Sequence, residues 1–173
     1  LFDEGLKELK MTPAQVKWHL LVDENGTGKK EAEFYQSQWK DKLGIDVDVE
    51  VLTKKERIAR AKAGDFEIVR YAWGPDYADP MTYLEIFHSK AKDINFAKYS
   101  NPEYDALLEK AAKEVDPQTR FGYFHQAEEM LMRDMGVTPL LYYNEMYLQS
   151  DKVKDSYHTA DGIYHFEYAD IAE

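Results

Sequence analysis

Carboxylates, aromatic rings and backbone stiffeners crowd one short segment of the sequence, residues 71–80, which read YAWGPDYADP. Pro75 and Pro80 restrict the backbone, whereas Gly74 frees it. An aromatic wall beside a carboxylate that is held in place suits a cation such as an ammonium group. The segment therefore predicts a rigid, acidic loop that binds a cation. The alternative is a strand-to-helix connection whose rings fill the core and whose Asp caps the next helix.

Other chemistry is weakly supported by the motifs. Asp76 and Asp79 could act as an acid–base pair, as in a glycosidase, but their spacing does not establish the required separation. Residues 26–30 resemble a phosphate-binding loop, yet Asp23 stands where that motif needs Gly, and Lys30 where it needs Ser or Thr. We therefore expect no nucleotide site.

Composition narrows the class of protein. The chain has 173 residues, 44% of them hydrophobic, which predicts a folded domain with a core. The net charge of −11 argues against a nucleic-acid or anionic-membrane partner. The absence of cysteine excludes disulfides and thiol catalysis, and the five histidines lack ligand spacing, so we expect neither a metal nor another cofactor. The longest apolar stretch, residues 139–143, is too short to span a membrane. Without an initiator Met or a signal peptide, the chain is expected to be a fragment or excised domain.

The first half of the chain alternates strands and helices. Apolar residues alternate along residues 16–22 and 45–51, and a β-rich run begins at residue 66 and feeds the acidic loop. Helices are expected at residues 1–10 and 29–43, and from a capping box at Thr53 to Ala63. This β-α-β-α-β order predicts an α/β fold with parallel strands and right-handed crossovers.

The second half is mainly helical. A short helix is expected at residues 81–87, followed by a polar loop at 89–99. Two Pro-initiated helices follow, opened by Asn101-Pro102 and Asp116-Pro117. Apolar runs predict strands at residues 140–143 and 146–148, and the tail from Asp151 onward is aromatic and irregular.

The ordered motifs resemble a known family. They are the strand–helix unit before WGPDYADP at residues 73–80, YSNPEYDALL at 99–108, and the long helix after Arg120 that precedes VTPLLYY at 137–143. Together they resemble the C-terminal lobe of oligopeptide-binding proteins of ABC importers, the peptide/nickel-type solute-binding family. The resemblance covers nearly all of residues 1–173. It implies a type II periplasmic-binding-protein-like lobe, with a mixed sheet flanked by helices, whose N-terminal lobe is absent from this chain.

The resemblance also implies a function, which is capture of oligopeptides between two lobes and delivery to the permease subunits of a membrane importer. It implies that Asp76 pairs with the peptide's α-ammonium and that Trp73 lines a side-chain pocket. Arg70 would reach a short peptide's carboxylate or brace the site, and a structural salt bridge is its alternative role. Some relatives carry a basic residue near position 28, where Gly28 stands here, so the carboxylate anchor stays open. The candidate ligand-binding residues are Arg70, Ala72, Trp73, Gly74, Asp76 and Tyr77.

Two other readings remain open at this point. A relative on the same fold could bind nickel, haem or a sugar. An enzyme could use Asp76 and Asp79, although binding needs no catalysis and we expect none. The expected location is outside the cytoplasm, lipid-anchored or periplasmic, and the expected partners are the peptide, the permease and the N-terminal lobe.

Overall fold

The computed structural model describes residues 1–144, 146–159 and 162–172. The chain divides into two compact units, Leu1–Ala72 and Trp73–Glu173. Each unit has a hydrophobic core of its own.

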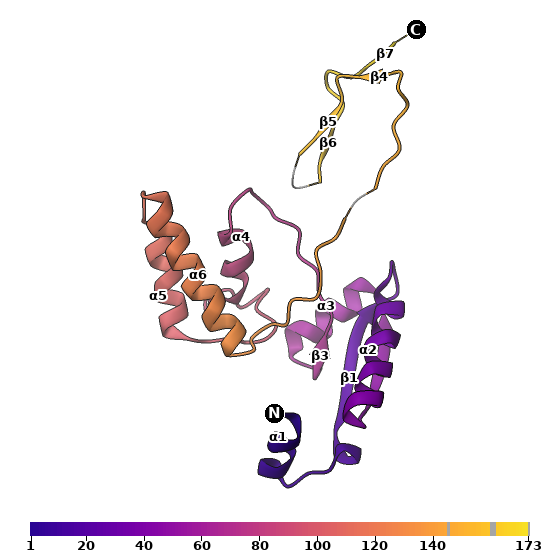
Figure 1. The fold of residues 1–173 in the computed structure, drawn as a ribbon, viewed down its shortest axis with the longest axis vertical. Helices are drawn as coiled ribbons and strands as arrows, with labels where there is room; N and C mark the ends of the chain where they lie inside the picture. The colour runs from indigo at the N-terminus through magenta and orange to yellow at the C-terminus, as the bar shows by residue number, and fades with distance from the viewer. Residues whose placement is uncertain (145, 160–161, 173) are drawn as a thin grey trace. The chain divides into compact units, whose positions relative to one another are not determined.

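The first unit is built on a parallel sheet of three strands in the order β2-β1-β3. Figure 1 labels β1 and β3 of this sheet, with α2 beside β1. The strands are β1 (Lys17–Asp23), β2 (Asp46–Leu52) and β3 (Ile68–Val69). The helices are α1 (Phe2–Leu9), the 3-10 turn η1 (Pro13–Gln15), α2 (Gly28–Leu43) and α3 (Lys54–Ala63). Each connection between strands that are consecutive in sequence contains one helix, α2 between β1 and β2 and α3 between β2 and β3, as the β-α-β-α-β pattern predicts.

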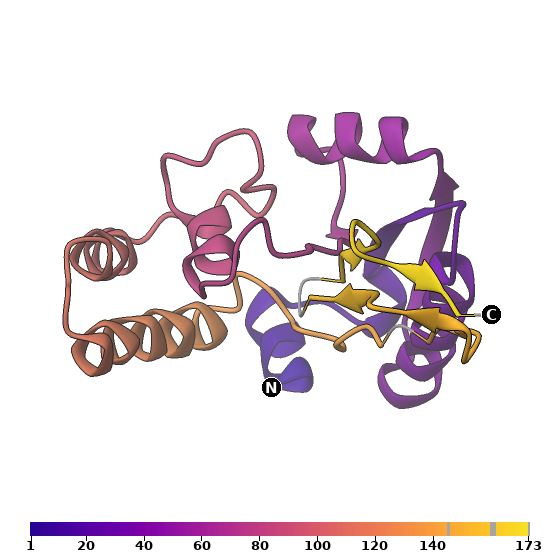
Figure 2. The same cartoon turned by 90° about the horizontal axis from the view of Figure 1, so that it is seen from above.

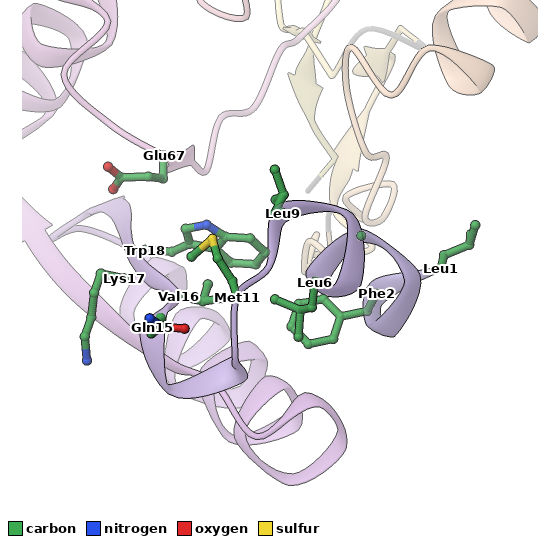
Figure 3. Close-up of a pocket in the computed structure, with 11 residues that line it drawn as sticks. Leu1, Phe2, Leu6, Leu9, Met11, Gln15, Val16, Lys17, Trp18 and Glu67 are labelled. Atoms are coloured by element: carbon green, nitrogen blue, oxygen red, sulfur yellow. The ribbon is translucent and has the colours of Figure 1, made fainter.

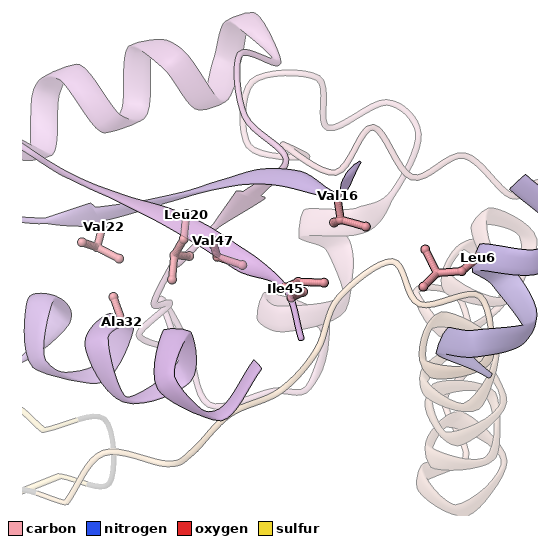
Figure 4. Packing of buried hydrophobic residues seen from close by; sticks show 7 residues of the cluster. All are labelled: Leu6, Val16, Leu20, Val22, Ala32, Ile45 and Val47. Carbon is pink, nitrogen blue, oxygen red and sulfur yellow. The ribbon is translucent and has the colours of Figure 1, made fainter. Parts of the chain in front are cut away.

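Alternation along the strands decides which face of the sheet is buried. Leu20 and Val22 of β1 and Val47 of β2 are at most 2% exposed and pack with Ala32 of α2. Figure 4 shows these side chains pointing from the strands toward that helix. Removing such side chains from water is the main stabilisation available to a unit of this size.

The opposite face of the sheet carries charged residues at its carboxyl end, where α3 lies. The Thr53 hydroxyl accepts the N–H of Glu56, and the Glu56 side chain accepts the N–H of Thr53 in return, so the predicted capping box is present. Arg57 of that helix is 3% exposed, donates to Asp23 at 2.8 Å and lies over the Tyr71 ring at 4.9 Å. One buried guanidinium therefore joins the ends of β1 and β3 to the start of α3.

The strand predictions are confirmed for β1 and β2 within a residue, whereas the third strand is shorter than expected. Only Ile68 and Val69 form ladder pairs, although the Arg70 N–H still donates to the Leu21 carbonyl. Residues 66–67 and 71–73, which the pattern includes in the strand, form no ladder pairs within the described part of the chain, because a favourable run becomes a strand only where a partner lies beside it. The sheet predicted as mixed contains only parallel pairs among the described residues. Antiparallel pairing occurs instead in two separate ribbons.

The second unit contains the helices α4 (Met81–Leu84), α5 (Pro102–Ala111) and α6 (Pro117–Arg133), with the 3-10 turn η2 (Glu85–Phe87) after α4. Figure 2 shows α5 and α6 lying side by side. The Tyr104 ring is fully buried between the helices, and its hydroxyl donates to the Leu84 carbonyl at 2.7 Å. This bond ties α4, and with it the end of the acidic loop, to α5.

The segment after α6 differs from the prediction. Residues 140–143 and 146–148, predicted as strands, form no ladder among the described residues. A strand needs a partner for its backbone groups, and apolar alternation alone does not supply one. The tail predicted as irregular forms two antiparallel pairs, β4 (Val153–Lys154) with β7 (Asp170–Ile171), and β5 (Tyr157–His158) with β6 (Tyr164–His165).

Candidate functional site

The acidic loop has no regular secondary structure between β3 and α4, yet its polar groups are held at several points. The Asp76 N–H donates to the Thr82 hydroxyl at 3.1 Å, and Thr82 is fully buried in α4. The Tyr77 hydroxyl donates to Glu85 at 2.7 Å. These bonds anchor the loop backbone and one of its rings to the α4–η2 segment.

Asp79 provides the strongest attachment of the loop. Its carboxylate accepts the Met81 N–H at 2.9 Å, which places it at the start of α4. Both carboxylate oxygens also accept from the Arg120 guanidinium of α6, one of them at 3.0 Å. The hydrogen bond from Arg120 lowers the pKa of Asp79. A carboxylate held in this way is ionised at neutral pH and is a poor proton donor.

Asp76 stands in contrast to Asp79. Its side chain is exposed, and it forms no hydrogen bond or ion pair with any residue that the structure describes. The hydrogen bond to the start of the next helix that was considered for an Asp of this loop is formed by Asp79, although the N-cap position itself is occupied by Pro80. The Asp76 carboxylate faces solvent, on a loop that is anchored at the Asp76 N–H and through the side chains of Tyr77 and Asp79.

Tyr77 is partly desolvated and has three carboxylates nearby. Desolvation, the hydrogen bond to Glu85, and the charges of Glu85, Asp79 and Asp76 raise the pKa of Tyr77 to about 12. Its hydroxyl remains protonated and continues to donate at physiological pH. Such surroundings favour a cationic ligand group over an anionic one.

Arg70 belongs to the first unit and follows β3 directly. Its Nε donates to Glu31 of α2 at 2.8 Å, and the two side chains are 13% and 17% exposed. Burial alone would raise the pKa of Glu31, but hydrogen bonds from Thr27 and Arg70 outweigh it and lower that pKa. The structural salt bridge considered for Arg70 is therefore present. Contact with a ligand carboxylate stays a prediction.

The remaining candidate residues have simpler surroundings. Ala72 and Gly74 are exposed and Trp73 is half-buried. A Cβ built on Gly74 would meet no heavy atom within 4 Å, so packing does not demand glycine there. Gly28 differs, because a Cβ at that position would lie 3.0 Å from the Asp23 carbonyl oxygen. A side chain at position 28 would require the end of β1 to shift.

Sequence reasoning missed the residues that hold the loop, namely Thr82, Glu85 and Arg120, and it missed Glu31 as the partner of Arg70. Arg120 lies 41 residues after Asp79, and nothing in the local pattern links them. The only usable signal was an Arg placed one turn after the Asp116-Pro117 helix start, on the side that faces α5.

A separate apolar pocket of about 440 Å³ lies in the first unit, at the amino end of β1 (Figure 3). Phe2 and Leu6 of α1 form one wall, and Met11 and Trp18 form another. None of the candidate ligand-binding residues lines it. In the described part of the chain no group of His, Cys, Asp and Glu side chains converges as a metal site, and no helix is long and apolar enough to cross a membrane.

An α/β unit followed by an anchored loop with one exposed carboxylate is the arrangement expected for a binding module of the periplasmic-binding-protein class, and the comparisons with known proteins support this class. Residues 2–95 match the bacterial extracellular solute-binding proteins, family 5, middle region. The chain belongs to this family. It is 33% identical over 172 residues to the dipeptide-binding protein DppE of Bacillus subtilis, covering 98% of this chain and 31% of that protein.

Solved structures agree with the family assignment. A substrate-binding domain of an oligopeptide ABC transporter from Bacillus anthracis matches with a TM-score of 0.84 and 30% identity, covering 99% of this chain and 34% of that one. Haemophilus influenzae OppA in complex with RPPGFSPFR matches with a TM-score of 0.76 and 32% identity, covering 81% and 28%. The predicted α/β, type II periplasmic-binding-protein-like fold class is thereby confirmed. The chain spans about a third of the length of these relatives, which are solute-binding proteins.

Proposed function

We propose that this chain is the C-terminal lobe of the solute-binding component of an ABC importer, which captures oligopeptides and delivers them to permease subunits. One observation carries the proposal, namely that Asp76 is exposed and unpaired among the described residues while the loop around it is anchored. A fixed carboxylate beside aromatic rings suits a peptide α-ammonium. The names of the relatives, which include dipeptide- and oligopeptide-binding proteins, support peptides as the ligand.

The proposal also covers the location and the second lobe. The family is described as extracellular and several relatives as periplasmic, which supports a place outside the cytoplasm, lipid-anchored or periplasmic. An N-terminal lobe is supported by the length of the relatives and by exposed apolar side chains after α6. Tyr142, Met146 and Leu148 are each at least 97% exposed, and exposed apolar groups gathered in this way indicate a surface that another part of a protein covers.

A hydrolase is the weaker alternative. General acid catalysis by the loop would need one carboxyl group with a raised pKa, but Arg120 lowers the pKa of Asp79. Binding without turnover is therefore the better proposal. A different solute is the stronger alternative, because one relative at 28% identity is described as a probable deoxycholate-binding protein.

Calorimetry with the full-length protein and a mixed peptide library tests the proposal. We expect saturable binding of free-amino peptides, and mass spectrometry should recover those peptides intact. Recovery of cleaved peptides would contradict a pure binding role. Binding of a bile acid, with no heat from peptides, would favour the alternative solute.

A further inference from the structure

The two carboxylates of the acidic loop have opposite surroundings. Asp79 forms a two-point ion pair with Arg120, and these side chains are 24% and 26% exposed. Asp76 has no ionic partner among the residues described. A guanidinium and a carboxylate in direct contact have no net charge together, so a third charge farther away than their separation is attracted or repelled only weakly. The loop therefore presents one uncompensated carboxylate instead of two.

Arg120 is held in place independently of the loop. Its Nε donates to the Ala111 carbonyl of α5 at 3.0 Å, and its guanidinium lies over the Phe124 ring at 4.7 Å. A guanidinium is protonated at physiological pH with or without a partner, and the hydrogen bond to Asp79 raises the pKa of Arg120 further. A fixed positive charge thus lies next to the loop whether or not Asp79 is there to neutralise it.

The charged groups in and beside the acidic loop all lie near the Tyr77 hydroxyl. Asp79 and Asp76 both act on the Tyr77 hydroxyl, and the charge of Arg120 is felt there too. An ion that reaches Asp76 would therefore also sense whether Asp79 is compensated. Because Asp76 is exposed, this influence should weaken as the salt concentration rises.

We propose that Arg120 is a specificity-determining residue of this site. By neutralising Asp79, it leaves Asp76 as the only carboxylate of the loop that can pair with a ligand, so the loop selects a single ammonium group. This inference rests on the proposed function, because it requires that the loop bind an ammonium.

If Arg120 acts by neutralising Asp79, then substitutions of Asp79 and of Arg120 should change the affinity for free-amino peptides in opposite directions. Asp79→Asn keeps an oxygen for the Met81 N–H but leaves the Arg120 charge uncompensated, so binding of free-amino peptides should weaken roughly threefold to fivefold. Arg120→Gln leaves the Asp79 charge uncompensated, so binding of the same peptides should strengthen by a similar factor. The gain should be larger for peptides with lysine at the N-terminus, which carry two positive charges. The double variant replaces the ion pair with a neutral amide pair, and it should return to the wild-type affinity.

The experiment measures these affinities by calorimetry in the full-length protein. The ligands are short alanine peptides with a free N-terminus, the same peptides N-acetylated, and the same peptides with N-terminal lysine. Arg133→Gln is the matched control, since Arg133 is exposed near the end of the same helix and pairs only with its neighbour Asp134 in the described structure. N-acetylated peptides should bind all variants alike.

The outcomes separate the inference from the proposed function. Affinity changes of opposite sign in the two single variants, which cancel in the double variant, support the inference that Arg120 acts by neutralising Asp79. Weakening by both single variants, for free and acetylated peptides alike, would show a structural brace and overturn the inference while leaving peptide binding intact. A wild-type protein that does not distinguish free from acetylated peptides would overturn ammonium recognition itself, and the inference with it.

Discussion

At the scale of single residues, Asp76 carries the main functional expectation. In the full-length protein, Asp76→Asn should weaken binding of free-amino peptides by roughly 2–5 kcal/mol, the usual cost of removing one partner from a charged pair that becomes buried in the complex. The amide conserves the shape of the carboxylate, so the circular dichroism spectrum should not change. Calorimetry measures the loss.

N-acetylated peptides serve as the control for this substitution. They lack the ammonium charge, so their affinity, which is already lower, should be nearly the same for the wild-type protein and the Asp76→Asn variant. Equal losses for both kinds of peptide would make Asp76 a structural residue. That result would favour the reading of this loop as a simple strand-to-helix connection.

A second residue-scale expectation concerns pH. His19 of β1 lies between Glu67, whose carboxylate is 2.8 Å from Nδ1, and Asp48 of β2, 3.8 Å from Nε2. The hydrogen bond to Glu67 and the nearby carboxylates raise the pKa of His19 above its ordinary 6.5. Because the pKa of His19 is raised in the folded protein, the stabilisation by the ion pair is complete below pH 6.5 and is lost as the pH rises through the folded-state pKa.

NMR titration should give a His19 pKa above 6.5, and the substitution Glu67→Gln should lower that pKa. Wild type should gain stability over His19→Gln only in acid, and a gain that grows with pH would refute the ion pair.

At the scale of elements, Arg57 decides how the carboxyl end of the sheet is held. Asp23→Ala removes the partner of a guanidinium that is 3% exposed, and this should cost about 3 kcal/mol of unfolding free energy. Adding Arg57→Met removes the stranded charge as well, so the double variant should recover part of that loss. Urea unfolding at neutral pH measures both values.

The comparison of these two variants distinguishes charge from packing. If Asp23→Ala and the double variant are equally destabilised, the ion pair contributes little and the stacking of Arg57 over Tyr71 matters more. Tyr71→Leu would then be expected to cost as much as Asp23→Ala. A matched control is Lys55→Met on an exposed position of the same helix.

At the scale of the whole molecule, the isolated 173 residues should bind peptides weakly or not at all. A peptide held between two lobes would lose the contacts and the exclusion of water that the other lobe supplies. Calorimetry on the isolated chain, with the full-length protein as the reference, tests this expectation. Sub-micromolar binding by the isolated chain would place the entire site within it.

Several strands, helices and the acidic loop of the molecule are determined by local sequence patterns alone. Alternation in residues 16–22 and 45–51 was enough to locate two strands, because side chains on successive strand positions point to opposite faces. The capping box at Thr53 and the Asn101-Pro102 and Asp116-Pro117 starts located helices, since those signals act over three or four residues. The acidic loop was likewise found from its composition alone.

Only the tertiary structure assigned different roles to Asp76 and Asp79. The sequence presents them as equivalent carboxylates three positions apart, and the difference arises from Arg120 and Thr82, which reach the loop from α6 and α4. The strands predicted at 140–143 and 146–148 failed for a related reason, because a ladder requires a second strand as well as a favourable run. Local pattern specifies an element, whereas pairing between distant residues depends on how the elements pack, and no short window of sequence contains that information.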